Sequence, residues 1–141
     1  MEQRLTVVTL GVADLERSAR FYEQALGWKR SAQSQDGVVF FSLGGWVLSL
    51  FGRDDLAADA GVSVEGSGFS GIALAHNVRS QGEVDAVLAQ AAQHGGRLVK
   101  AGEKASWGGY SGYFADPDGH LFEVAHNPFW PLDERGQVEL G

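Results

Sequence analysis

The stretch Gly108–Asn127 reads GGYSGYFADPDGHLFEVAHN and predicts two strands joined by a tight turn. The turn is Asp116–Gly119, in which Pro117 presets φ and Asp116 can bond back to the backbone. The second strand carries one carboxylate, Glu123, inside the apolar run LFEV. Burying that carboxylate is costly unless it meets water, a partner or a ligand. The role of Glu123 is therefore the main question that the sequence raises.

The bulk composition limits what the protein can be. With 141 residues, 44% of them hydrophobic and 21% charged, the chain suits one soluble globular domain, 1–141, with a sizeable core. Its net charge of −7, without a basic cluster, would repel phosphate backbones and anionic membranes, so we expect neither nucleic acid nor a membrane as partner. The absence of cysteine excludes disulfides, thiolate metal sites and a cysteine nucleophile. No apolar signal core or bilayer-spanning stretch is visible, and we expect a cytoplasmic protein.

The first part of the chain, residues 5–51, reads as β-α-β-β-β. A β-branched strand at Leu5–Gly11 precedes a helix that begins after an N-cap at Asp14 and ends at Gly27. Three more strands are predicted, separated by Asp-Gly and Gly-Gly turns: Trp28–Ser34, Val38–Leu43 and Trp46–Phe51.

Residues 69–126 repeat the same order. A strand at Phe69–Ala75 is followed by a helix with the capping-box signature Ser80 and Glu83, which ends at two glycines, residues 95–96. The remaining predicted strands are Arg97–Lys100, Tyr110–Ala115 and His120–Ala125, with residues 101–109 as a loop or a long hairpin end. Two such modules indicate an internal duplication and an α+β fold.

Two segments lie outside the modules. Residues 52–68 hold a short helix at Asp54–Ala60 and either connect the modules or cover a binding cleft. Residues 127–141 read as an extended tail, whose Phe129 and Trp130 dock on the body or on a partner subunit.

The paired modules, with VADLERSARFY at Val12–Tyr22 and ADPDGHLFE at Ala115–Glu123, resemble the vicinal oxygen chelate superfamily. That superfamily includes glyoxalase I, extradiol dioxygenases, fosfomycin-resistance enzymes and bleomycin-binding proteins. The resemblance extends to about Asn127. It implies two tandem βαβββ modules whose curved mixed sheets surround a cleft, with helices on the convex side, and it implies a homodimer. These motifs are specific for the fold and not for a reaction.

Catalytic members of the superfamily are metalloenzymes, and the resemblance places their four ligand positions at Val7, Ser49, Gly71 and Glu123. Only Glu123 is a suitable ligand, because valine and glycine have no donor side chain and a serine hydroxyl binds such divalent ions poorly. Strand alternation directs none of His76, His120 and His126 at Glu123. His94 lies in the last turn of the predicted helix, where it favours the helix C-terminus. We therefore expect no cofactor and no divalent metal.

Three roles for Glu123 remain open. It pairs with an arginine or accepts hydrogen bonds as a structural residue, or it recognises a polar or cationic group of a small molecule. The third role is general base catalysis, which desolvation would favour by raising the pKa of the carboxyl group. The sequence assigns no second acid or oxyanion donor to support that chemistry.

Aromatic residues and one arginine complete the predicted ligand-binding set, which is Val7, Ser49, Gly71, Trp107, Tyr110, Tyr113 and Arg53. The three aromatic residues pack in the core or form a wall of the cleft. Tyr110 and Tyr113 are an odd number apart, so at most one faces the cleft. Arg53 meets an anionic substrate or Glu123, or it is a solvated loop residue.

These features predict a metal-independent protein of the bleomycin-resistance kind that binds a small-molecule ligand in the sheet cleft. The alternative is an enzyme, an isomerase, lyase or epimerase acting on a carbonyl substrate, with Glu123 as the general base. A metal-dependent glyoxalase is a further alternative.

Overall fold

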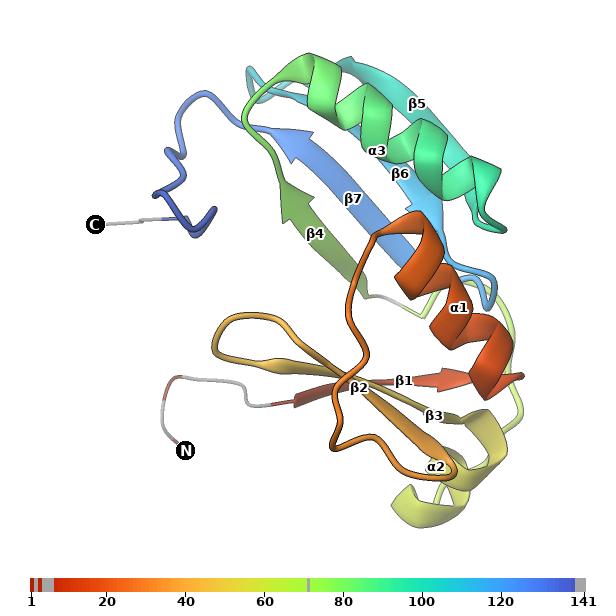
Figure 1. Ribbon diagram of the computed structural model, residues 1–141. Coiled ribbons are helices and arrows are strands. Elements are labelled where there is room, and N and C mark those ends of the chain that lie inside the picture. Colours follow the sequence, from red (N-terminus) through yellow and green to blue (C-terminus); the bar gives the residue numbers. More distant parts are fainter. Residues whose placement is uncertain (2, 4–6, 71, 139–141) are drawn as a thin grey trace. The chain divides into compact units, whose positions relative to one another are not determined.

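A computed structural model describes residues 1, 3, 7–70 and 72–138 and confirms the α+β class (Figure 1). The chain divides into two compact units, Met1–Ser70 and Gly71–Gly141, each of which combines a mixed sheet with a covering helix. The short segment predicted at Asp54–Ala60 is a helix. In the described part of the chain, no helix has the length and apolar character needed to cross a membrane.

The described part of the first unit contains three strands and two helices, in the order β1 (Val7–Val12), α1 (Leu15–Ala25), β2 (Val38–Ser42), β3 (Val47–Gly52) and α2 (Arg53–Ala60). The strands are ordered β1-β3-β2, with β1 parallel and β2 antiparallel to β3. The Asp14 side chain accepts a hydrogen bond from the Arg17 amide at 2.9 Å, as an N-cap does. Gly27, at φ +68°, follows the end of α1, so the predicted helix is confirmed at both ends.

Aromatic packing joins α1 to its sheet. The buried Tyr22 ring lies 5.7 Å from Phe41 of β2 and 5.4 Å from Trp28, measured between ring centroids. Leu48 and Leu50 of β3 are fully buried. Because Phe41 is paired with Leu48, these residues identify the face of the sheet that α1 covers.

The prediction of a strand at Trp28–Ser34 is wrong. The segment makes one isolated antiparallel bridge, between Arg30 and Phe41, and then turns. The Ser34 amide donates to the Ser31 carbonyl at 3.1 Å, and the Ser31 hydroxyl accepts from the Gln33 amide at 3.1 Å. Serine side chains thus offer the backbone local partners that compete with a strand ladder.

The described part of the second unit contains β4 (Ala73–Asn77), α3 (Gln81–Gln93), β5 (Arg97–Lys104), β6 (Tyr110–Ala115) and β7 (Leu121–His126). The strands are ordered β4-β7-β6-β5, and α3 lies across one face of the sheet (Figure 1). The first strand begins later than the predicted Phe69–Ala75. The predicted Arg97–Lys100 continues to Lys104, which makes residues 105–109 the hairpin end.

Helix α3 is fixed by its cap and by its apolar side. The Ser80 hydroxyl accepts from the Glu83 amide at 3.2 Å, and the Glu83 carboxylate accepts from the Arg79 amide at 2.8 Å. Val84 and Leu88 are buried between the helix and the sheet. The capping signature read from the sequence is therefore confirmed.

The predicted turn before β7 is also confirmed. The buried Asp116 carboxylate accepts hydrogen bonds from the amides of Asp118, at 2.9 Å, and His120, at 2.8 Å. Gly119, at φ +88°, closes the turn by donating to the Asp116 carbonyl. This turn fixes where β7 begins and so determines which face of the sheet Glu123 occupies.

The tail lies on the second unit. The Arg79 guanidinium donates to the carbonyls of Leu132, at 3.0 Å, and Asp133. The Phe129 ring lies directly against Gly108 in the β5–β6 turn. Docking of a tail aromatic residue on the body of the chain is thus observed for Phe129.

Candidate functional site

The second sheet has two different faces. Phe114 and Phe122 stack at 5.0 Å on the face toward α3, where Gly112 also lies against Leu88. Side chains alternate along a strand, so Glu123 lies on the opposite face. The carboxylate therefore does not enter the core beneath the helix.

One row of side chains crosses this second face, which α3 does not cover. Glu123 of β7 is paired with Tyr113 of β6 on one side and with Ala75 of β4 on the other. Tyr113 is in turn paired with Lys100 of β5. Ala75 leaves space beside the carboxylate, and both Glu123 and Tyr113 are half-buried. We call Ala75, Glu123, Tyr113 and Lys100 the open-face row, where open means only that α3 does not cover this face.

The charges in the open-face row act on one another. Burial raises the pKa of Tyr113 above its usual value, and the negative charge of Glu123 and a hydrogen bond with it add to the increase. The positive charge of Lys100 opposes it. Lys100 Nζ lies 2.7 Å from Glu103 Oε1, and this hydrogen bond raises the pKa of the ammonium group. Glu123 thus meets a phenol, and this neighbour was not identified from the sequence.

Tyr110, by contrast, lies on the face toward α3. Its hydroxyl donates to Asp85 Oδ1 of that helix at 2.8 Å, and this bond raises the pKa of Tyr110. The two tyrosines therefore occupy different faces, as their odd spacing indicated. Only Tyr113 shares a face with Glu123.

The other aromatic and basic residues of the predicted set lie outside the open-face row. Trp107 is in the β5–β6 turn, where its ring approaches Gly109 and remains 44% exposed. Arg53 begins α2, and its guanidinium donates to the Val64 carbonyl at 3.1 Å. This bond gives Arg53 a local structural role.

The ligand positions in the first unit carry no strong donors. Ser49 is buried on the face opposite Leu48, and its lateral neighbours are Thr9 and Phe40. Val7 is on that same face and is 46% exposed. Gly71 lies outside the described residues. Within residues 7–70 and 72–138, no three His, Cys, Asp or Glu side chains gather as a metal site would require. This donor set does not fit a divalent ion.

The histidines do not complete the site either. His76 and His126 are paired with Val124 and Tyr110 on the α3 face, and burial lowers the pKa of His76. His126 Nδ1 lies 3.3 Å from the Val78 carbonyl oxygen. His94 caps the end of α3, and His120 precedes β7.

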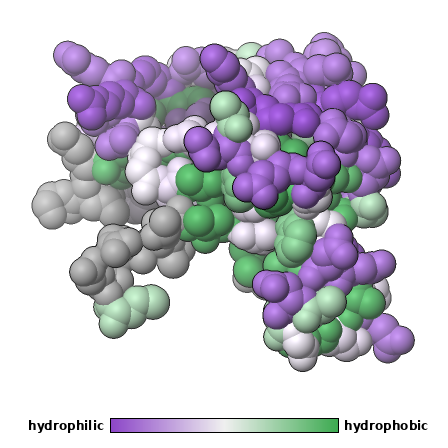
Figure 2. Space-filling model, turned by 60° about the horizontal axis from the view of Figure 1, so that its bottom comes forward, coloured by the Kyte–Doolittle hydropathy of each residue, from purple (hydrophilic) through white to green (hydrophobic). Residues whose placement is uncertain are grey.

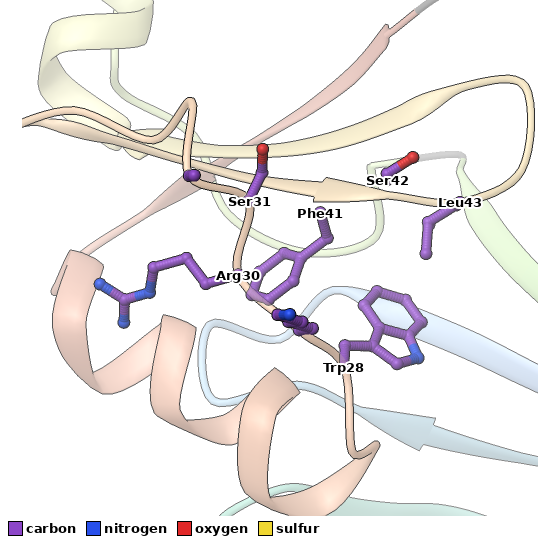
Figure 3. A pocket seen from close by; sticks show the side chains of 8 residues that line it. Trp28, Arg30, Ser31, Phe41, Ser42 and Leu43 are labelled. Carbon is purple, nitrogen blue, oxygen red and sulfur yellow. The ribbon is translucent and has the colours of Figure 1, made fainter.

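The first unit has an open hollow of about 500 Å³ between the segment after α1 and β2 (Figure 3). Trp28, Phe41 and Leu43 provide its apolar walls. Arg30 extends away from the Trp28 ring (Figure 3) and is held by Glu16 and Glu23, each at 3.0 Å. The sequence does not predict this hollow, because Trp28–Ser34 reads as a strand. None of the predicted site residues lines it.

Comparison with known proteins identifies the family. The family model described as the glyoxalase/bleomycin resistance protein/dioxygenase superfamily matches residues 4–124. The chain belongs to this superfamily. The resemblance seen in its two end motifs is therefore confirmed, as are the tandem modules of the fold.

Several solved structures resemble the chain along nearly its whole length. A glyoxalase-related enzyme from Fulvimarina pelagi is 39% identical, with 99% of each chain covered and a TM-score of 0.88. A hypothetical protein from S. aureus is 27% identical over 90% of this chain and 95% of its own, with a TM-score of 0.78. A lactoylglutathione lyase from Agrobacterium tumefaciens, 22% identical over 94% of this chain and 100% of its own, shares the fold with a TM-score of 0.69.

Proposed function

We propose that this superfamily member binds a small molecule on the open face of its second sheet, without a divalent metal ion. The observation that carries the proposal is the lateral pairing of Glu123 with Tyr113, both half-buried and both away from α3. A carboxylate next to a phenol can accept and donate hydrogen bonds within one small area. Such convergent polar groups on a largely apolar framework are typical of ligand sites.

Metal independence is supported by the donor set. Three of the four superfamily ligand positions are Val7, Ser49 and Gly71, which leaves Glu123 alone. One carboxylate does not provide the three or four protein ligands that a catalytic divalent ion requires. We therefore expect no stoichiometric Ni, Zn, Fe or Mn by elemental analysis of protein purified without added metal. One bound equivalent that is lost in Glu123→Ala would refute this part of the proposal.

A thermal-shift screen of small aromatic and cationic compounds tests binding. A ligand of the native state raises the melting temperature with increasing concentration. We expect Glu123→Gln to abolish that shift and Glu65→Gln, at an exposed loop carboxylate of the first unit, to preserve it. Equal shifts in wild type and Glu123→Gln would show that the ligand does not meet Glu123.

A second candidate function is enzymatic, with Glu123 as a general base toward a carbonyl substrate. The presence of Tyr113 beside Glu123 favours it, because a phenol is a proton donor next to the base. The 39% identical structure is described as a glyoxalase-related enzyme, which supports the same class. Turnover that Glu123→Gln loses, while its fold is retained by circular dichroism, would establish this function.

We also propose that the protein is a homodimer. Hydrophobic and hydrophilic surface lie side by side on the face shown in Figure 2. Large apolar side chains are exposed, among them Phe69, Ile72, Phe129 and Trp130. A second copy of the chain could cover such side chains. Light scattering coupled to size exclusion should give twice the chain mass of 15.1 kDa, and a monomer at micromolar concentration would refute the proposal.

A further inference from the structure

We infer that Tyr113 is a second catalytic residue, which together with Glu123 forms an acid–base pair for enolisable carbonyl compounds. In this pair the carboxylate removes a proton from carbon while the phenol donates to the carbonyl oxygen. The inference rests on the proposed small-molecule site of the second sheet and deepens the enzymatic candidate, since it gives Tyr113 a catalytic role and names the class of substrate.

The backbone register places the two side chains next to each other on one face of the sheet. Glu123 and Tyr113 are directly opposite on neighbouring antiparallel strands. Side chains in that relation have Cβ atoms about 4.5–5.5 Å apart, so both reach one small molecule lying over the sheet. Ala75, on the far side of Glu123, does not obstruct that molecule. The carbonyl group and the adjacent C–H bond of one substrate therefore fit the two side chains at once.

The proton transfer balances without a metal, an oxidant or a reductant. Glu123 takes the proton from the carbon next to the carbonyl, and the electron pair of the broken C–H bond forms a C=C bond. The carbonyl π electrons move to oxygen, which takes the Tyr113 proton to give an enol. Return of one proton to carbon and of one from oxygen to the tyrosinate then completes an isomerisation or epimerisation.

The electrostatics of the open-face row favour this order of events. While Glu123 is charged, its negative charge and the hydrogen bond with it keep Tyr113 protonated. Once Glu123 has accepted the substrate proton, that charge is gone, and the opposing influence of Lys100 remains. Tyr113 thus becomes a better acid at the moment when charge develops on the carbonyl oxygen. Lys100 acts through Tyr113 and is a positioning residue.

Deuterium exchange tests the inference directly. The probes are pyruvate and hydroxyacetone in D2O, with loss of the α-proton signal followed by ¹H NMR. Wild type should accelerate exchange of at least one probe over buffer, and Tyr113→Phe and Glu123→Gln should each lower that rate by roughly 10²-fold. The control is Tyr110→Phe, which also removes one phenol hydroxyl, but from the face toward α3. It should leave the exchange rate unchanged.

The outcomes separate this inference from the binding function. No acceleration by wild type, or full activity in Tyr113→Phe, overturns the acid–base pair. If ligands still raise the melting temperature in a Glu123-dependent way, the binding function holds and only the inference fails. If Tyr113→Phe does not fold, the coupling between Tyr113 and Glu123 is tested by titrating the tyrosines of wild type and Glu123→Gln, followed by ultraviolet difference spectroscopy. The Tyr113 pKa must fall in Glu123→Gln, and an unchanged pKa overturns the coupling that the pair requires.

Discussion

Gly112 is the position in the second unit where a single methyl group should do the most damage. It lies on β6 between α3 and β5, on the face opposite Tyr113. A Cβ atom at this position would lie 2.5 Å from Leu88 Cδ1, 2.7 Å from the Lys100 carbonyl oxygen and 2.9 Å from the Gly102 amide nitrogen. The leucine tip can rotate, but the other two atoms are backbone of β5. We therefore expect Gly112→Ala to force the two strands apart.

The size of the effect follows from these distances. Inserting a methyl group into a close-packed core typically lowers the free energy of unfolding by about 1–3 kcal/mol. Because two of its contacts are with backbone atoms, Gly112→Ala should lower it by about 3 kcal/mol. For a domain of this length that corresponds to a fall in melting temperature of roughly 6–12 °C. Thermal and urea unfolding followed by circular dichroism measure both quantities.

A second glycine provides the matched control. Gly82 is in the first turn of α3, and a Cβ atom there would meet only the Ser80 hydroxyl, at 4.0 Å. Gly82→Ala should raise the free energy of unfolding by about 0.5 kcal/mol, because alanine favours the helix and restricts the unfolded chain. A Gly112→Ala protein as stable as wild type, or a Gly82→Ala protein destabilised as strongly as Gly112→Ala, would refute the packing described for this sheet.

Three further predictions concern a cap, an ion pair and the open-face row. Ser80→Ala should lower the free energy of unfolding by about 1 kcal/mol, measured in urea, because the Glu83 amide loses its acceptor. Arg30→Met should cost about 1 kcal/mol at low salt and less at high salt. The hydrogen bond from Arg30 lowers the Glu16 pKa below its usual value, so this stabilisation is present at neutral pH and is lost as pH falls through the acidic range. Acid titration of stability should therefore be shallower in Arg30→Met. Lys100→Met should raise the Tyr113 pKa in ultraviolet titration, and a lower value would contradict the open-face row.

Local signals in the sequence were sufficient for most of the fold. Asp14 and Ser80 were recognisable as caps because their side chains meet amides three residues away. The turn before β7 was recognisable for the same reason, since Asp116 bonds within its own turn. The segment after α1 was misassigned because its serines form local bonds as well, and composition alone did not show that these bonds replace a ladder.

The neighbours within the open-face row depend on the register between strands, which the alternation of residues along one strand does not give. Counting alternate residues along a strand correctly assigns Tyr110 and Tyr113 to opposite faces of the sheet, and likewise Glu123 and Phe122. The count is valid there because β6 and β7 pair without interruption. Pairing between β5 and β6 is interrupted. Leu98 is opposite Phe114, and an uninterrupted ladder would then place Val99 opposite Tyr113.

An irregularity between Leu98 and Lys100 changes that neighbour. It shifts β5 by one residue, so the partner of Tyr113 is the cation Lys100 in place of the apolar Val99. A valine there would leave the charge of Glu123 unopposed and would hold the Tyr113 proton more firmly. The shift in register therefore places a positive charge near Tyr113, where it opposes the effect of the one carboxylate of β7. A count of residues along a single strand does not reveal such a shift.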